Sequence, residues 1–413
     1  MKINETQLAL VDRQIKRILA SGNYYSEVYR KAGITGVSSP EDFEKIPFTD
    51  KADLRNAYPL GIQAVPDEQV VRIHSSSGTT GKPVIIPYTA KDVADWATMF
   101  ARCYEMAGIT PRDRIQITPG YGLWTAGIGF QAGCEKLGAM AIPMGPGNTD
   151  KQIQMMIDLE STVLCATSSY ALLLAEEINR RGLRDKIRLR KGIIGSERWS
   201  DAKRNYIARE LGIELYDIYG LTEIYGPGIG INCPGQTGMH IFDDFLYTEI
   251  IDPKTGEVLP DGEEGEIVIT TLVKEGAPLI RFRTHDLSRI LPGVCSCGCT
   301  SPRLDTIRGR SDDMFKVHGV NMFPSQVEEI LGQVDGVSSE YKIDIAHDES
   351  INRDIIMVTA EAEGRVSFPQ TADQIRTLFK SRLNVTPKVV IVSLNTLPRS
   401  EKKTRRVFDH REE

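Results

Sequence analysis

The sequence predicts an α/β fold, with layers of parallel sheet wrapped by helices in a large N-terminal domain. A small β-barrel-like subdomain within it and a small α+β domain at the C-terminus complete the predicted architecture. Three observations support this. The 413 residues are too many for one ordinary core. Short apolar runs alternate with helix-like segments in the middle of the chain, and short strands separated by turn residues follow.

The first part of the chain is expected to be helical and then rich in turns, up to about residue 65. The parallel sheet is expected from its short apolar runs, at residues 114–118, 139–143, 163–167, 192–195 and 213–216. Helix-like segments separate the later runs, at residues 150–159, 170–181 and 201–211. Ligands of such sheets bind beyond the carboxyl ends of the strands, so chemistry is expected in the loops there.

The pattern changes at about residues 240–310, where strands at 247–251 and 266–271 flank a turn at 252–257. A small antiparallel sheet or barrel fits these signals. A compact region follows, and its elements are expected from about Pro324 (helix), near Ile343 and at 355–359 (strands), near 374–383 (helix) and at 388–393 (strand). The predicted domains are therefore residues 1–311 and 312–413.

Composition excludes several classes of protein. The net charge of −6 and the pI of about 5.7 argue against a nucleic-acid-binding protein. The start of the chain has no signal-peptide pattern, and no apolar run approaches the roughly 18 residues of a membrane helix, so the cytoplasm is the expected location. Seven cysteines, an odd number, argue against a disulfide framework.

The segment from His74 to Pro83 is dense in hydroxyl groups and glycine, and ends with a lysine before the proline. Apolar runs at residues 70–73 and 84–86 flank it, so it is expected to be a loop between two strands of a hairpin. It is not a Walker A loop, which needs Ser or Thr after the lysine and a following helix. Backbone N–H groups, hydroxyls and one ammonium suit phosphate oxygens. The predicted phosphate loop consists of Ser75, Ser76, Ser77, Gly78, Thr79, Thr80, Gly81 and Lys82.

This loop resembles the signature loop of the adenylate-forming (acyl-CoA synthetase) superfamily, and the rest of the chain is similar to its phenylacetate-CoA ligase branch. Four further segments match in order: Tyr219-Gly220-Leu221-Thr222-Glu223, Arg283-Thr284-His285-Asp286-Leu287, Gly309-Arg310-Ser311-Asp312-Asp313 and Leu397-Pro398-Arg399-Ser400-Glu401-Lys402-Lys403.

The resemblance implies an enzyme that activates a carboxylic acid, phenylacetate by default, with ATP and magnesium and then transfers it to coenzyme A. It also implies a homodimer and a mobile C-terminal domain. One alternative keeps the fold but passes the acyl or adenylyl group to another acceptor, such as a carrier protein or an amine. Another is a non-catalytic nucleotide sensor, against which the presence of Lys403, Glu223 and Asp286 argues.

Adenylation needs aligned reactants, a neutralised triphosphate and stabilised transition-state charge, but no protein nucleophile. Glu223 follows a predicted strand, and its carboxylate suits magnesium. The alternative is a carboxylate in the first turn of a helix. Thr222 is expected to contact the α-phosphate.

Other roles follow from the resemblance. Asp286 is expected to bind the ribose hydroxyls, with a turn-forming aspartate as the alternative. The implied nucleotide contacts also include Arg310, Gly195, Ser196, Glu197, Asp217, Tyr219 and Gly220.

Lys403 matches the catalytic lysine of the family, although Lys402 stands where the family usually has glycine, so Lys402 competes for the role. Asp312 matches the hinge residue. Lys316 and Gly319 are expected to face coenzyme A. For the acyl pocket we predict Tyr121 and Trp124, two rings among small residues, with ordinary core residues as the alternative.

A cysteine cluster lies outside this chemistry. Cys295, Cys297 and Cys299 fall within five residues, and Cys233 and His240 lie upstream. Thiolates with one imidazole suit tetrahedral zinc, so we predict a structural zinc bound by Cys233, His240, Cys295 and Cys297, with Cys299 as the spare thiol. Free surface thiols and an iron–sulfur site are the alternatives.

Overall fold

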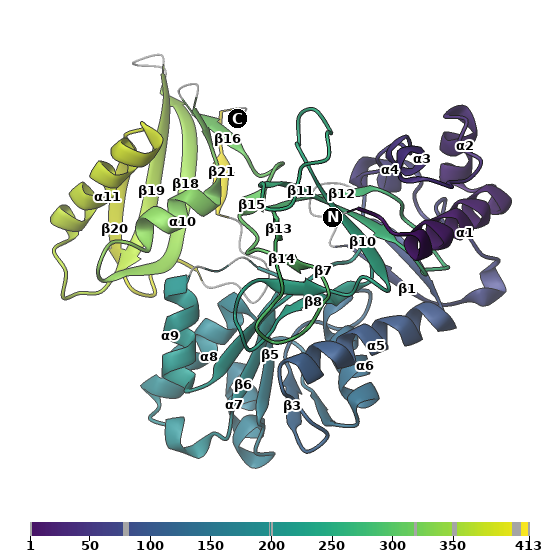
Figure 1. Cartoon of the computed structure of the whole chain (residues 1–413). Coiled ribbons are helices and arrows are strands. Elements are labelled where there is room, and N and C mark those ends of the chain that lie inside the picture. Colours follow the sequence, from purple (N-terminus) through teal and green to yellow (C-terminus); the bar gives the residue numbers. More distant parts are fainter. Residues whose placement is uncertain are drawn as a thin grey trace. The chain divides into compact units, whose positions relative to one another are not determined.

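The structure is a computed structural model that describes residues 2–76, 82–197, 199, 201–317, 320–348, 353–398 and 406–411 (Figure 1). The chain divides into two compact units. The first unit comprises Met1–Ala166, Asp185–Ser196 and Glu214–Ile307. The second unit comprises Thr167–Arg184, Glu197–Ile213 and Arg308–Glu413.

The first unit begins with helices, as expected. In α1 (Glu5–Ser21), the side chain of Asn4 caps the first turn and Gly22 ends the helix with φ 67°. One face of α1 is buried because apolar residues recur at helical spacing, at Leu8, Val11, Ile15 and Ile18. The shorter helices that follow are α2 (Tyr24–Lys31), α3 (Pro40–Glu44) and α4 (Lys51–Asn56).

A two-stranded hairpin follows, made of β1 (Val70–Ser75) and β2 (Ile85–Thr89). It leads directly into α5 (Ala90–Met106), which begins where Thr89 and Asp92 form a capping box. The predicted hairpin around the phosphate loop is therefore confirmed.

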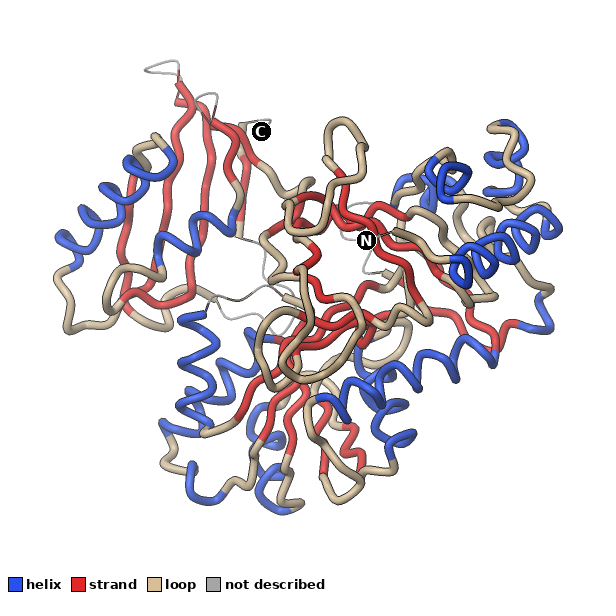
Figure 2. The backbone as a smooth tube through the Cα atoms, viewed as in Figure 1, coloured by secondary structure: helices blue, strands red, loops and turns tan. Residues whose placement is uncertain are grey.

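The large sheet has the strand order β13-β14-β9-β8-β7-β6-β5-β3-β4. Its parallel part confirms the predicted parallel sheet and comprises β3 (Arg114–Ile117), β4 (Met140–Pro143), β5 (Val163–Thr167), β6 (Lys191–Gly195) and β7 (Glu214–Leu221). Figure 2 shows these strands with helices beside them, among them α6 (Ala126–Leu137) and α7 (Thr149–Asp158).

The other part of this sheet was not expected. It is antiparallel and comprises β8 (Gly226–Asn232), β9 (Met239–Ile241), β13 (Ile290–Leu291) and β14 (Arg303–Leu304). Because β8 pairs with β7, β7 continues to Leu221 rather than ending near Tyr216 as predicted. A second, antiparallel sheet contains β10 (Leu246–Ile251), β11 (Gly265–Thr271) and β12 (Phe282–Ser288), as the predicted hairpin pattern indicates.

In the second unit, α8 (Ser168–Arg180) contacts α9 (Asp201–Leu211). The C-terminal region adds β15 (Gly309–Arg310) and the hairpin of β16 (Phe315–Val317) and β17 (Val320–Met322). It also holds a sheet of order β20-β19-β18-β21 and two helices. These elements are α10 (Pro324–Leu331), β18 (Val337–Asp348), β19 (Arg353–Ala362), α11 (Phe368–Leu383), β20 (Lys388–Ser393) and β21 (Val407–Asp409). An α+β arrangement was expected here.

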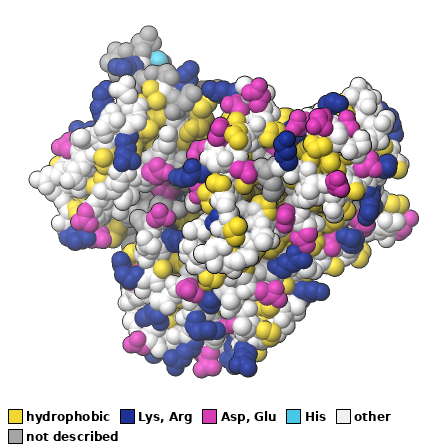
Figure 3. All heavy atoms as spheres, viewed as in Figure 1, with side chains coloured by type: hydrophobic (Ala, Val, Ile, Leu, Met, Phe, Trp, Pro, Cys, Tyr) yellow, Lys and Arg dark blue, Asp and Glu magenta, His cyan; other side chains and the backbone are white. Residues whose placement is uncertain are grey.

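In the part of the chain that the structure describes, no helix is both long enough and apolar enough to cross a membrane. On the face shown in Figure 3, basic and acidic side chains are interspersed.

Candidate active site and metal centre

The stem of the predicted phosphate loop is ordered by backbone pairing that ends at Ser75. Ser76 continues the stem, because its N–H donates to the carbonyl of Val84 and its hydroxyl accepts the N–H of Val84, both at 3.0 Å. Nζ of Lys82 lies 5.6 Å from the ring centroid of Tyr58. The remaining predicted loop residues lie outside the described part of the chain: Ser77, Gly78, Thr79, Thr80 and Gly81.

His74, one residue before Ser75 on β1, anchors this stem next to the loop. Its ring is buried and lies edge-on to Tyr88 and Trp96, with centroid distances of 5.1 and 5.6 Å. Burial lowers the pKa of His74 to about 4, so the ring is neutral near pH 7. Its Nδ1–H donates to the carbonyl of Leu123 at 3.2 Å. The stem of the phosphate loop is thereby joined to the segment that carries the predicted acyl-pocket residues.

Glu223 lies in a turn at residues 222–225, after β7 ends. The alternative that it is the first-turn carboxylate of a helix is therefore wrong. Glu223 is buried, and its Oε1 lies 2.8 Å from Nζ of Lys51. Apart from this ion pair, Oε1 has no hydrogen-bond partner among the described residues. Such a buried carboxylate oxygen fits a hard cation such as Mg²⁺. Next to it, Oγ1 of Thr222 lies 3.3 Å from Oγ1 of Thr125.

Two lysines that were not predicted from the sequence contact Glu223. Lys51, the first residue of α4, forms the ion pair with its carboxylate. Lys274, fully buried, donates to the carbonyl of Ile224 and lies 3.5 Å from that of Glu223. Burial lowers the pKa of Lys274 to about 7, and the charges of Asp92 and Glu223 oppose this shift. Neither lysine belongs to a motif, so no local signal in the sequence marks it.

Asp286, the predicted ribose-binding residue, meets a second predicted nucleotide contact. It lies within β12 and accepts a hydrogen bond of 2.7 Å from the hydroxyl of Tyr219 on β7. Its N–H donates to Oγ1 of Thr284 at 3.1 Å, and the residue between them, His285, has φ 65°. Because Asp286 lies in a strand, the turn-forming alternative is wrong.

Two of the predicted glycines lie where backbone segments approach closely. A Cβ atom on Gly195 would lie 2.5 Å from the carbonyl oxygen of Ile218, and one on Gly220 would lie 2.0 Å from that of Gly226. Ser196, directly after β6, is exposed and has φ 68°. Side chains larger than hydrogen would therefore separate the strands at the edge where the nucleotide is predicted to bind.

The other two predicted contacts are engaged differently. The N–H of Asp217 donates to Oδ1 of Asn232 at 2.9 Å. In the second unit, Oε2 of Glu197 accepts hydrogen bonds from the hydroxyl of Ser168 at 3.1 Å and from the N–H of Ser169 at 3.0 Å. Glu197 thus stabilises the first turn of α8, and its nucleotide role stays a prediction.

Arg310 and Asp312 contact each other in the second unit. The guanidinium of Arg310 donates two hydrogen bonds to the carboxylate of Asp312, at 2.8 and 2.9 Å. Lys316 lies on β16 and is exposed, and its carbonyl accepts a hydrogen bond of 2.8 Å from Arg411. The remaining predicted residues of this unit lie outside the described residues: Gly319, Lys402 and Lys403.

The two predicted acyl-pocket rings differ in environment. Tyr121 is partly buried against the core, and Cβ atoms built on Gly127 and Gly145 would lie 2.7 and 3.7 Å from its ring. Trp124 is 45% exposed, so the alternative that it is a core residue is wrong. Gly127 therefore lets the Tyr121 ring pack closely against α6, and the acyl-pocket role of both rings stays a prediction.

The four predicted zinc ligands come together in the first unit. The ligand atoms of Cys233, His240, Cys295 and Cys297 all lie within 4.8 Å of one another. Sγ of Cys233 lies 3.5 Å from Sγ of Cys295, and Sγ of Cys297 lies 3.4 Å from Nε2 of His240. Cys233, Cys295 and His240 are buried and Cys297 is exposed, so two of the three thiols do not lie on the surface.

The surroundings of the cluster favour a metal. Nδ1–H of His240 donates to the carbonyl of Ser301 at 3.0 Å, which leaves Nε2 as the ligand atom facing the thiols. Cys299 is not one of the four, and its N–H donates to Sγ of Cys297 at 3.4 Å. All seven cysteines are free, which agrees with the absence of a disulfide framework. Three thiolates with one imidazole form a donor set that fits tetrahedral Zn²⁺.

Comparison with known proteins agrees with the predicted family. The family model described as AMP-binding enzyme matches residues 12–272, and the AMP-binding enzyme C-terminal domain matches residues 319–411. Phenylacetate-coenzyme A ligase of Escherichia coli (strain K12) is 42% identical over 99% of this chain and 96% of its own length. The enzyme of the same name from Pseudomonas putida is 42% identical over 90% of this chain and 85% of its own length.

Among solved structures, 2-hydroxyisobutyryl-CoA ligase in the postadenylation state, in complex with R3-HIB-AMP, has a TM-score of 0.88. The match covers 98% of this chain and 89% of that chain at 26% identity. These comparisons confirm the resemblance stated from the motifs, the α/β fold class and the predicted class of enzyme, an adenylate-forming ligase. The chain belongs to the phenylacetate-coenzyme A ligase family of AMP-binding enzymes.

Proposed function

We propose that this protein is an ATP-dependent acid–coenzyme A ligase that acts on phenylacetate or a related aryl acid. The substrate carboxylate attacks the α-phosphate of ATP, and the bond to pyrophosphate breaks to give an acyl-adenylate. The thiol of coenzyme A, having lost its proton, then attacks the acyl carbonyl, and AMP leaves. The relatives named phenylacetate-coenzyme A ligase support this choice of acid and acceptor.

One observation supports the proposal: β7 and the turn after it carry both Tyr219, which bonds to the proposed ribose ligand Asp286 on β12, and Glu223, the proposed metal ligand. Tyr219 on β7 orients Asp286 through the hydrogen bond of 2.7 Å, and Glu223 follows in the turn after the strand. The nucleotide would therefore bind with its ribose at Asp286 and its phosphates toward Thr222 and Glu223. Mg²⁺ bound to Glu223 would neutralise charge on the triphosphate.

The remaining roles are proposed from the family motifs. Lys403 bridges the acid and the α-phosphate, Asp312 is the hinge of a C-terminal domain at residues 312–413, and Lys316 and Gly319 face coenzyme A. Tyr121 and Trp124 line the acyl pocket. The phosphate loop from Ser75 to Lys82 covers the triphosphate, which its hairpin stem supports.

A structural zinc is proposed as well, bound by Cys233, His240, Cys295 and Cys297. It would clip β9, which supplies His240, and the segment before it, which supplies Cys233, to the segment between β13 and β14, which supplies Cys295 and Cys297. A closed site with four protein ligands has no position for substrate, so the metal would contribute to folding rather than to turnover.

Two further properties are proposed as well. A cytoplasmic location agrees with seven free cysteines, because thiols stay reduced there. A homodimer is proposed from the family resemblance. The molar mass measured by light scattering after gel filtration tests it.

The decisive experiment measures AMP and pyrophosphate release from ATP, with and without coenzyme A, over a panel of aryl acids and short aliphatic acids. The panel includes phenylacetate and 2-hydroxyisobutyrate. We expect AMP release that requires both phenylacetate, or a close aryl analogue, and coenzyme A. Pyrophosphate release that coenzyme A does not influence would favour another acceptor. Nucleotide binding without release of either product would identify a sensor and contradict the proposal.

A further inference from the structure

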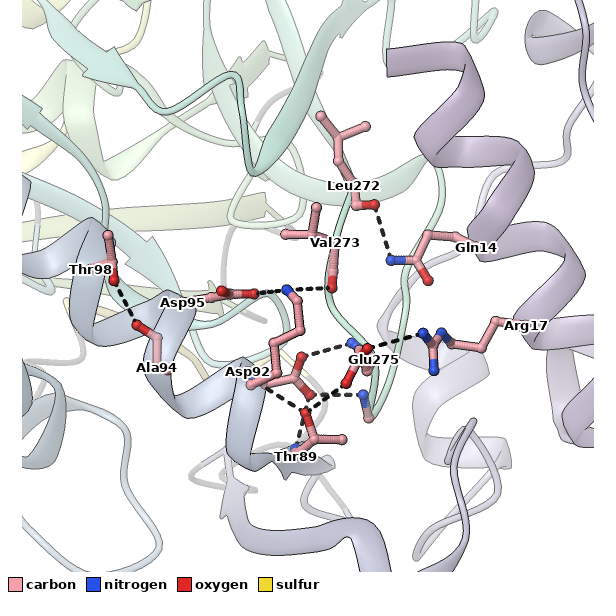
Figure 4. A network of polar contacts seen from close by, with 12 residues as sticks. Gln14, Arg17, Thr89, Asp92, Ala94, Asp95, Thr98, Leu272, Val273 and Glu275 are labelled. Atoms are coloured by element: carbon pink, nitrogen blue, oxygen red, sulfur yellow. Dashed lines mark hydrogen bonds and ion pairs between the residues drawn. The ribbon is translucent and has the colours of Figure 1, made fainter. Parts of the chain in front are cut away.

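Residues 272–276, which follow β11, are held from two helices by polar contacts (Figure 4). From α1, Nε2 of Gln14 donates to the carbonyl of Leu272 at 3.1 Å, and Arg17 pairs with the carboxylate of Glu275 at 3.1 Å. From α5, the buried carboxylate of Asp92 accepts the N–H groups of Glu275 and Gly276, at 2.7 and 2.8 Å. The backbone on both sides of Lys274 is therefore fixed.

From this fixed backbone, the side chain of Lys274 reaches the aromatic rings of Tyr88 and Tyr225. Its Nζ lies 4.4 Å from the ring centroid of Tyr88 and 4.8 Å from that of Tyr225. The Tyr88 hydroxyl donates to the carbonyl of Tyr225 at 2.9 Å, which joins the two tyrosines beside the lysine. Lys274 and both rings are fully buried, so the ammonium has no contact with bulk water.

In place of water, the ammonium donates hydrogen bonds to the carbonyl of Ile224 and, at 3.5 Å, to the carbonyl of Glu223. Burying an ammonium is costly unless it is well paired, and the cation–π contacts and charge-assisted hydrogen bonds supply this pairing. If the space between the two rings only had to be filled, an apolar side chain of similar length would fill it without the cost of desolvating a charge. The choice of lysine therefore points to its acceptors, which are the backbone of the turn that carries Glu223.

We propose that Lys274 is a positioning residue for adenylation, which holds the 222–225 turn by its carbonyls and so aims the Glu223 carboxylate at the metal-bound triphosphate. This inference rests on the magnesium-binding role proposed for Glu223. Lys274 itself does not touch substrate. Tyr88, which contacts Lys274, also contacts His74 at the stem of the phosphate loop. One group of buried side chains therefore supports both the phosphate loop and the turn that carries Glu223.

The test compares Lys274→Met with the unmodified enzyme in the two half-reactions. Pyrophosphate release from ATP and phenylacetate is measured without coenzyme A over a range of Mg²⁺ concentrations. Because loss of a group that orients a metal ligand weakens metal binding or activity, we expect the half-saturating Mg²⁺ concentration to rise roughly 10–100-fold. Thioester formation from supplied phenylacetyl-adenylate involves no triphosphate, so its rate should stay within about twofold of the unmodified enzyme.

Lys91→Met is the matched control. Lys91 lies on α5 and contacts the same loop, through the carbonyl of Val273 at 3.5 Å, but is exposed and does not reach the turn. Its variant should keep the ordinary Mg²⁺ dependence. If Lys274→Met does not fold, Lys274→Gln replaces it, because this neutral side chain tolerates burial and is too short to reach both carbonyls. An ordinary Mg²⁺ dependence in a folded variant at position 274 overturns the inference.

A double-mutant cycle separates this inference from the proposed function. Glu223→Gln alone should raise the Mg²⁺ requirement, and adding Lys274→Met should raise it little further, because both changes act through one carboxylate. Additive effects would mean that Lys274 acts elsewhere, which overturns the inference. If Glu223→Gln itself leaves the Mg²⁺ requirement unchanged, the metal-binding role of Glu223 fails, and the proposed function fails at that point.

Discussion

The hydroxyl of Tyr219 donates a hydrogen bond of 2.7 Å to Oδ2 of Asp286, which joins the parallel sheet to the antiparallel sheet at the predicted ribose site. A carboxylate held at one oxygen by such a hydrogen bond keeps a fixed orientation, which suits the ribose-binding role proposed for Asp286. Under the proposed function, Tyr219 therefore supports nucleotide binding through Asp286.

We therefore expect Tyr219→Phe to lower kcat/KM for ATP roughly 10–100-fold, because a hydrogen bond to a charged group contributes about 1.5–3 kcal/mol. The measurement is the steady-state rate at saturating acid and coenzyme A. Tyr24→Phe is the matched control, since Tyr24 donates at 3.0 Å to Asp53 on the N-terminal helices. Equal effects of the two changes would show that Tyr219 has no special role.

Lys403→Ala should suppress adenylation strongly while thioester formation from supplied acyl-adenylate stays largely intact. The reason is that the proposed role of Lys403 lies in the first half-reaction alone, where its charge bridges the acid and the α-phosphate. Both half-reactions are measured for Lys403→Ala and for Lys402→Ala. A loss of adenylation in Lys402→Ala instead would move the role by one residue.

Removal of the cysteine cluster should lower thermal stability and remove a metal. We expect about one zinc per chain by elemental analysis of the purified protein, and none in a Cys295→Ser/Cys297→Ser double variant. The variant should melt at a lower temperature, because metal binding energy contributes to folding. Cys299→Ser should keep its zinc, since Cys299 lies outside the four-ligand set. Zinc retained in the double variant would refute the assignment.

Glu266 gives a defined dependence of stability on pH. Burial alone would raise its pKa, but hydrogen bonds from Arg283, at 2.9 and 2.7 Å, and from His285 outweigh it and lower the pKa to about 2. A carboxyl with a depressed pKa stabilises the fold above its unfolded pKa of about 4.3, and this stabilisation is lost as the pH falls toward 2. Between these values we expect a loss of roughly 3 kcal/mol, at about 1.4 kcal/mol per pKa unit.

Glu266→Gln tests this expectation, because glutamine keeps the shape and cannot titrate. The melting temperatures of the two proteins are compared at pH 7, 5, 4 and 3. The gap between them should be largest at pH 7 and narrow below pH 4.5. A gap that stays constant over this range would show that the charge of Glu266 contributes nothing.

Much of the fold was predictable because buried parallel strands appear as short, continuous apolar runs. The antiparallel extension of the large sheet was not. β8 contains Gly226-Pro227-Gly228, residues that usually interrupt strands. Packing explains them: a Cβ atom on Gly226 would lie 2.7 Å from the ring of Trp96, and one on Gly228 would lie 2.5 Å from the ring of Phe100. Tertiary contact with α5 thus decides what the local pattern cannot.

The candidate site divides in the same way. Glu223, Asp286 and the proposed zinc ligands could be selected because each stands in a motif or a cluster of one chemical type. Lys51 and Lys274 could not, because a lone lysine carries no sign of what it contacts. Each lysine acts on Glu223 through tertiary structure, one from the start of α4 and one from the loop after β11.

The contacts of α1 have a consequence for synthesis of the chain on the ribosome. Gln14 and Arg17 bond to residues 258 positions later, so their partners emerge long after the helix itself. At about 5–20 residues per second, this interval lasts roughly 13–50 s. Throughout it, the apolar face of Leu8, Val11, Ile15 and Ile18 lacks the later members of its core cluster, such as Leu272. The first helix to be made is thus among the last to reach its final place, and during this delay it presents the kind of surface that chaperones bind.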